Sequence, residues 1–193
     1  PTGTTNVNIV GALDVDGTTN LDVVDVDGAV NFAADVIFAD GADIITASAG
    51  TSNFRAGVNA GNSIASGGNY NVVVGDEAGT AITTGDSNVF VGYQSGDATT
   101  TSDSNVGVGR GTLTTNILSD HNTAIGNGAL FTHNQASSID SYNTAVGSNA
   151  GAAVTTGIQN TLIGALAGDA LTDADYNVAV GGYALTSDTL GSR

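Results

Sequence analysis

The stretch Asn122-Thr123-Ala124-Ile125-Gly126-Asn127-Gly128-Ala129-Leu130 contains the pattern that decides the fold. The pattern reads Asn-x-x-x-Gly-x-x-small-Gly/Leu and occurs eight times, beginning at Asn53, Asn71, Asn88, Asn105, Asn122, Asn143, Asn160 and Asn177. Successive copies start 18, 17, 17, 17, 21, 17 and 17 residues apart. A fixed period of this length predicts a repeat architecture in which each copy forms one structural unit.

Each copy has a fixed glycine at its fifth position, which indicates a positive φ angle or a close backbone approach. The eight glycines are Gly57, Gly75, Gly92, Gly109, Gly126, Gly147, Gly164 and Gly181. Between Asn and Gly most copies have a β-prone trio such as Val72-Val73-Val74, which favours a short, half-buried strand. The sequence therefore predicts one coil per copy, made of a strand, a glycine corner and a second short strand. The recurring Asn is expected to form a ladder whose amides bond between successive coils.

The remaining residues of each period are rich in Thr, Ser, Asp and Gly, which is typical of outer return loops. Four extra residues lengthen the loop that precedes Asn143, within the range 131–142. Insertions in a solenoid map to an exposed face. Phe131, His133 and Tyr142 in this loop are the candidates for ligand contact, and the alternative is a solvated insertion.

The composition argues against an enzyme. The chain has 28 glycines and lacks cysteine, methionine, tryptophan and lysine, so most residues that build catalytic and redox sites are absent. Its net charge of −16 disfavours nucleic acid, which needs clustered Lys and Arg, and anionic membrane surfaces. No apolar run approaches the roughly 18 residues of a transmembrane helix, so membrane insertion is not expected.

Residues 1–50 differ from the repeats, because Asp14-Val15-Asp16-Gly17 and Asp25-Val26-Asp27-Gly28 suggest short strands joined by Asp-Gly turns. A segment this short and polar does not enclose a core alone, so we expect three copies to wrap into a β-prism-like shaft. Asp-x-Asp-Gly also suggests calcium, but a complete binding loop is absent. No metal site or cofactor is predicted, and Asp22, Asp25 and Asp27 are the fallback ligands for a structural calcium ion.

Catalytic constellations have simpler explanations. His121 and His133 are the only histidines and lie in or beside polar loops. Asp173 and Asp175 could serve glycoside hydrolysis, but they occupy the same return-loop position as Asp86 and the aspartates of other copies. No catalytic residue is predicted.

The repeats beginning at Asn122, Asn143 and Asn177 resemble the head repeats of trimeric autotransporter adhesins and related repeats of bacteriophage tail fibres. The resemblance covers about residues 53–185. It implies an all-β homotrimer in which a left-handed parallel β-roll, residues 51–193, follows the shaft. Stacked coils would leave the inner sheet of each chain with an apolar face that only neighbouring chains can cover, so we expect trimerisation to be part of folding.

Two departures favour the phage branch: the period of 17 is longer than that of adhesin heads, and no heptad stalk or membrane anchor is present. We therefore expect a structural component of a phage tail fibre or spike, located in the virion, that presents or forms a device for attachment to the host surface. Its partners would be itself as a homotrimer, other virion proteins and a glycan or protein of the host. The alternative is the passenger domain of a bacterial trimeric adhesin at the cell surface. A third hypothesis, a polysaccharide depolymerase, requires a groove with carboxylates that break the repeat.

Overall fold

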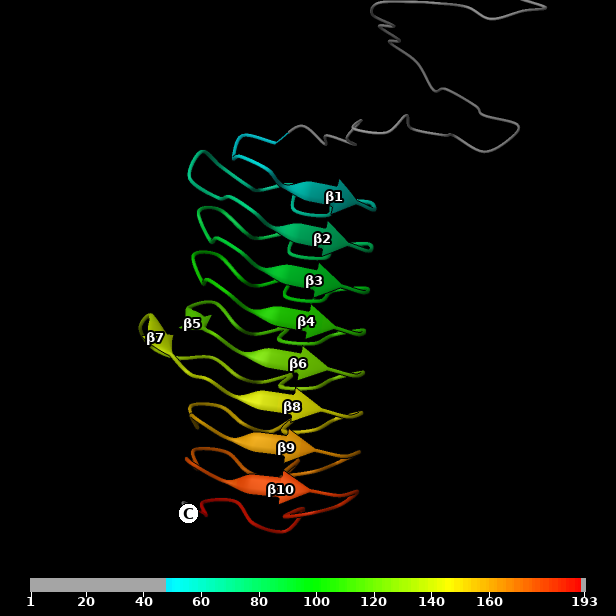
Figure 1. Ribbon diagram of the computed structural model, residues 1–193, viewed down its shortest axis with the longest axis vertical. Helices are drawn as coiled ribbons and strands as arrows, with labels where there is room; N and C mark the ends of the chain where they lie inside the picture. Colours follow the sequence, from blue (N-terminus) through cyan, green and yellow to red (C-terminus); the bar gives the residue numbers. More distant parts are fainter. Residues whose placement is uncertain (1–47, 192–193) are drawn as a thin grey trace, which may run out of the picture. The chain divides into compact units, whose positions relative to one another are not determined.

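The computed structural model describes residues 48–191, and within them the chain is a parallel β-solenoid without a helix. Eight three-residue strands form one sheet in the order β1-β2-β3-β4-β6-β8-β9-β10, and two two-residue strands, β5 and β7, form a second sheet (Figure 1). The strands are β1 Phe54–Ala56, β2 Val72–Val74, β3 Val89–Val91, β4 Val106–Val108, β5 Ser119–Asp120, β6 Thr123–Ile125, β7 Ile139–Asp140, β8 Thr144–Val146, β9 Thr161–Ile163 and β10 Val178–Val180. The predicted all-β solenoid is confirmed for these residues.

Every copy of the sequence pattern forms one coil, and equivalent residues of neighbouring coils are paired directly. Val73 pairs with Phe90, and Phe90 pairs with Gly107, so the strands stack without a shift. The predicted second strand of each coil is not formed, because a series of turns follows the glycine corner instead. The predicted shaft, residues 1–50, lies almost entirely outside the described residues.

The glycine corner depends on both a backbone angle and a close contact between coils. Gly92 has a φ of +132°, and a Cβ atom there would lie 2.6 Å from the carbonyl oxygen of Gly109 in the next coil. Gly109 has the same relation to Gly126, at 2.8 Å. A side chain is therefore excluded by strain and by the stacking distance together.

The centre of each strand points into the coil, where the chain encloses its own core. Phe90, Leu130 and Leu162 are fully buried there, and the small residues at the eighth position of the pattern pack beside them. The size of the residue at the strand centre is complementary to that at the ninth position of the pattern. Phe90 lies against Gly96, where a Cβ would be 2.5 Å from its ring. In the next coil the strand centre is Gly107, and the ninth position is Leu113. The inward residues are thus covered by the chain itself, and only outward residues are left for another chain.

The recurring asparagines form the predicted ladder along the whole stack. The side-chain oxygen of Asn88 accepts hydrogen bonds from the backbone N–H and the Nδ2 of Asn105, at 3.0 and 3.3 Å. Asn88 in turn donates through Nδ2 to the carbonyl oxygen of Ser102, at 2.8 Å. The same backbone bond joins all successive copies from Asn53 to Asn177, since the backbone N–H of each later Asn donates to the Oδ1 of the Asn one copy earlier. These buried amides supply both a donor and an acceptor, which explains why the position is always Asn.

Candidate functional site

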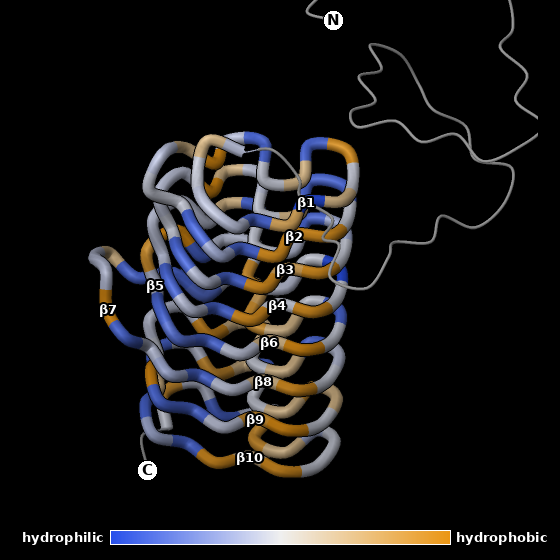
Figure 2. Tube along the Cα trace, turned by 45° about the horizontal axis from the view of Figure 1, so that its top comes forward, coloured by the Kyte–Doolittle hydropathy of each residue, from blue (hydrophilic) through white to orange (hydrophobic). Residues whose placement is uncertain are grey.

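The outward face of the eight-stranded sheet is apolar along the stack. The first and third residues of each strand point away from the core, and they align in two columns that are mostly Val and Ile, with Thr at the start of β6, β8 and β9. Figure 2 shows these hydrophobic segments in line from strand to strand. Ile125 and Ile163 are 39% and 40% exposed, and Val180 is 66% exposed. We call these two columns the sheet face; a contiguous apolar surface of this kind indicates a place where another molecule packs.

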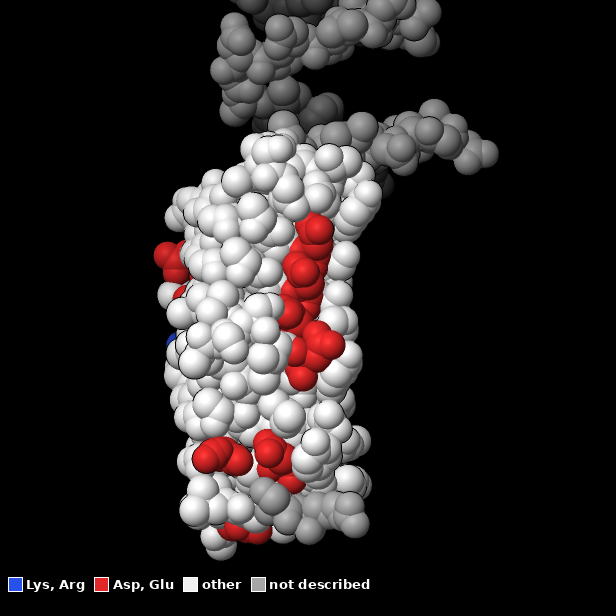
Figure 3. Space-filling view, turned by 90° about the vertical axis from the view of Figure 1, so that its left-hand side faces the viewer, with Lys and Arg blue, Asp and Glu red and all other residues white. Residues whose placement is uncertain are grey.

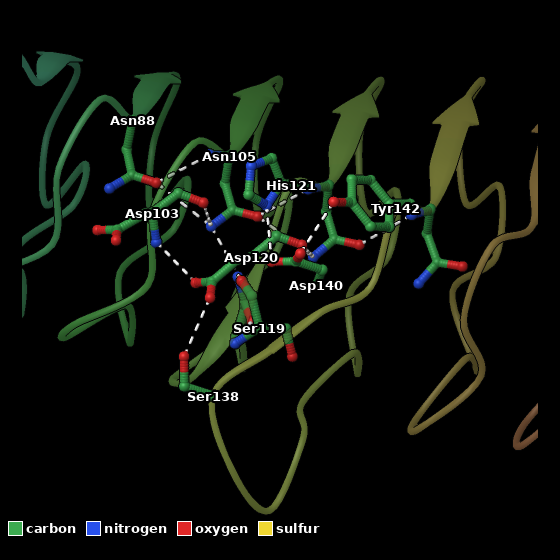
Figure 4. A network of polar contacts seen from close by, with 12 residues as sticks. Asn88, Asp103, Asn105, Ser119, Asp120, His121, Ser138, Asp140 and Tyr142 are labelled. Carbon is green, nitrogen blue, oxygen red and sulfur yellow. Dashed lines mark hydrogen bonds and ion pairs between the residues drawn. The ribbon is translucent and has the colours of Figure 1, made fainter.

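The four-residue insertion projects from the stack and carries the short strand β7, which pairs with β5 (Figure 1). Its base holds a polar cluster in which His121, Asp140 and Tyr142 point toward one another (Figure 4). His121 Nδ1 lies 3.1 Å from a carboxylate oxygen of Asp140, and the Tyr142 hydroxyl donates to the other oxygen at 2.8 Å. This bond raises the pKa of the Tyr142 phenol, because it stabilises the protonated form.

The cluster lacks the third member of a hydrolytic triad. Among the described residues, no hydroxyl oxygen hydrogen-bonds to His121, and the nearby Ser138 donates to Asp120 instead, at 3.0 Å. His121 and Asp140 are both substantially exposed, so their pairing is weakened by solvent. The geometry fits a surface cluster that fastens the insertion to the stack.

The predicted contact residues of the insertion separate into two groups. Phe131 and Tyr142 are 43% and 50% exposed and are available to a ligand. His133 is wrongly predicted as a contact residue, because its side chain is fully buried. It occupies the inward position that Ile82, Val154 or Leu171 occupies in other coils.

The buried imidazole of His133 has incomplete hydrogen bonding. Its Nε2 lies 3.5 Å from the Nδ2 of Asn143, and its Nδ1 has no hydrogen-bond partner in the described part of the chain. Burial lowers the pKa of His133 to about 4, since the charged form would lose its hydration. The residue is therefore a neutral core side chain at neutral pH.

A row of carboxylates follows the return loops along the stack, on the face that Figure 3 presents. The backbone N–H of Asp86 donates to the carboxylate of Asp103, and the N–H of Asp103 donates to that of Asp120, at 2.6 and 2.7 Å. Burial and the charges of Asp120 and Asp86 raise the pKa of Asp103, although its bond from the Asp86 N–H lowers it. These aspartates act as a second ladder that complements the asparagines.

Asp173 and Asp175 are explained by the same structural roles. Asp175 accepts a hydrogen bond from the backbone N–H of Ile158 at 2.8 Å, and Asp173 accepts one from Thr156 at 3.2 Å. Both bonds join one coil to the next, which leaves the depolymerase hypothesis without a distinct catalytic pair here.

Metal ligands are not assembled within residues 48–191, since no group of three or more acidic or histidine side chains there could hold an ion. Asp22, Asp25 and Asp27 lie outside the described residues, so the calcium fallback stays a prediction. In the same described range, no helix is long and apolar enough to cross a membrane.

Neither protein-family models, nor curated proteins, nor solved structures gave a match for this chain. Inference about function rests on the solenoid and its surfaces.

Proposed function

We propose that this chain is a structural segment of a phage tail fibre or spike, which acts as a homotrimer and holds or forms an attachment device for the host surface. The observation that carries the proposal is the sheet face, which leaves two in-register apolar columns partly exposed on a rod of stacked coils. A secreted or particle-borne rod with such a face gains stability when copies of the chain cover it.

The geometry suits association along the whole length rather than at one point. Each strand contributes the same two outward positions, for example Val106 and Val108 in β4, so equivalent chains can pack coil against coil. Side-by-side packing would place these carboxylates at the outside, because Asp86 and Asp103 belong to the return loops and Asp120 to β5, and none of them to the eight-stranded sheet. In the proposed trimer the roll is left-handed and continues a β-prism shaft formed by residues 1–50.

The proposed role is mechanical and adhesive, not enzymatic. The buried asparagine ladder and the aspartate ladder at the return loops both bond one coil to the next, so they serve the rigidity of the rod. Rigid spacing and a repeated surface are what a fibre between a particle and a cell requires.

The adhesin alternative shares the same solenoid and differs in location. Antibodies raised against residues 48–191 and imaged by immunogold electron microscopy distinguish the two. The proposal predicts gold on the tail fibres of particles whose genome encodes the chain. Gold on the surface of cells that contain no particles would overturn it in favour of the adhesin passenger.

A further inference from the structure

A notch opens on the turn side of the solenoid where two successive coils lack a side chain. The seventh position of the pattern is Gln94, Gly111, Gly128 and Asn149 in four consecutive coils. The two glycines leave a depression of about 450 Å³ that is bounded along the stack by Gln94 and Asn149. This volume falls within the range of small-molecule pockets, ~300–1,000 Å³.

One wall of the notch carries a cation that is exceptional in this acidic chain. Arg110 is exposed, and its guanidinium carbon lies 5.9 Å from the centre of the Tyr93 ring. Within residues 48–191, no carboxylate forms an ion pair with Arg110, whereas His121 pairs with Asp140. The ring orients the guanidinium, and its planar group of donors remains available for an external carboxylate.

The lining of the notch also includes an aromatic ring. Phe131 is 43% exposed and stands over Gly111, where a Cβ would lie 3.6 Å from the ring. The hydroxyl oxygen of Thr114, another lining residue, is shielded from solvent and has no hydrogen-bond partner among the described residues. The exposed amides of Asn127 and Asn149 complete the lining.

We propose that the notch binds a sugar acid, such as a hexuronic acid or a nonulosonic acid at the end of a glycan. The apolar face of a pyranose ring stacks on Phe131, its hydroxyls pair with the amides of Asn127 and Asn149, and its carboxylate pairs with Arg110 in a bidentate manner. A polyanion is disfavoured by the net charge of −16, whereas a single carboxylate meets the one local cation. This inference rests on the attachment role proposed above, because it names the chemistry that the fibre would recognise.

The repeat itself supplies a substitution that closes the notch without disturbing the fold. Gly111 has a φ of +61°, and the equivalent Asn59 and Asn149 adopt +57° and +55°. A Cβ at Gly111 meets its nearest atom at 3.4 Å, which is an ordinary contact. Gly111→Asn should therefore fold normally and fill the site. Leu166→Asn places the same side chain at the same turn position outside the notch, at a φ of +58°, and is the matched control.

Saturation-transfer difference NMR on the full chain tests the proposal with D-glucuronic acid and N-acetylneuraminic acid as probes. Glucose serves as the neutral comparison and acetate as the simple anion. We expect saturation transfer to at least one sugar acid, retained in Leu166→Asn, lost in Gly111→Asn, and weakened about 10-fold or more in Arg110→Gln.

Three results would overturn the inference. They are no transfer to either sugar acid, equal transfer to glucose, or equal binding by wild type and Arg110→Gln. Displacement of the sugar by equimolar acetate would likewise reduce the notch to a simple anion site and reject the sugar-acid assignment. The native mass of the same samples is measured in parallel, so failure of the proposed trimer is read separately from failure of ligand binding.

Discussion

Replacing Gly92 by alanine should destabilise the solenoid more than the loss of glycine flexibility alone can explain. The added methyl carbon would lie 2.6 Å from the carbonyl oxygen of Gly109. This is roughly 0.9 Å inside the ~3.5 Å optimum of such contacts. The two coils must separate, and this stretches the bonds that join them, from Gly109 N to the Val91 carbonyl at 2.8 Å and from Gly111 N to the Tyr93 carbonyl at 3.0 Å.

The magnitude follows from a comparison with two glycines that share the strain but not the contact. Gly181 has a φ of +123°, and a Cβ atom there would have no neighbour within 4 Å; Gly67 has a φ of +109°, and its Cβ would meet its nearest atom at 3.6 Å. Alanine at either position should cost ~1–3 kcal/mol for the unfavourable backbone angle. Gly92→Ala should cost about 2 kcal/mol more, since two inter-coil hydrogen bonds at ~1 kcal/mol each are weakened.

Urea unfolding followed by circular dichroism measures the free energy of unfolding of the three variants. Gly67→Ala is a second control at the other end of the eight-stranded sheet, since Gly67 lies between β1 and β2 whereas Gly181 follows β10. A Gly92→Ala protein that is no less stable than Gly67→Ala would refute the argument that the glycine column sets the approach of the coils.

Three further substitutions test the interior. Asn105→Ala should lower the free energy of unfolding by ~2–6 kcal/mol in the same urea assay, because the buried carbonyl of Ser119 and the backbone N–H of Asn122 each lose a hydrogen-bond partner. Asn127 is exposed, so Asn127→Ala should have little effect. Gly96→Leu should lower the melting temperature through its clash with the Phe90 ring, and adding Phe90→Ala should restore most of the loss; absence of rescue would reject the size complementarity. Because of His133, the free energy of unfolding should fall by about 3 kcal/mol as the pH drops from 6.5 to 4. The pKa of His133 is about 4 in the folded chain and about 6.5 in the unfolded chain, so the unfolded chain binds the proton at a higher pH. His133→Leu should remove this dependence from a pH series of melting curves.

The sequence was sufficient for features that repeat in every coil. The Asn ladder and the glycine corner could be predicted because a hydrogen bond or a positive φ angle is needed at the same place each time, as at Asn105 and Gly92. His133 could not be placed, since a polar residue in a polar-looking segment gives no sign that it replaces an aliphatic core residue. Aligning the copies would have exposed it, because Ile82 and Leu171 hold the same position.

The candidate binding surfaces were predicted only in part. Phe131 and Tyr142 were expected at the surface from the insertion, and both are exposed. The notch was not foreseen, because it depends on missing side chains at Gly111 and Gly128 in adjacent coils. The seventh position of the pattern varies from copy to copy. A single glycine at this position therefore does not indicate a depression unless the adjacent coil also has glycine there.

We propose above that copies of this chain associate through the sheet face. Native mass spectrometry of the full chain tests this most directly. We predict a particle of three times 18.9 kDa. The double variant Ile125→Asp and Ile163→Asp should dissociate into monomers, while Phe131→Asp, similarly exposed but outside the sheet, should remain a trimer. A wild-type chain that is folded and monomeric would contradict the claim.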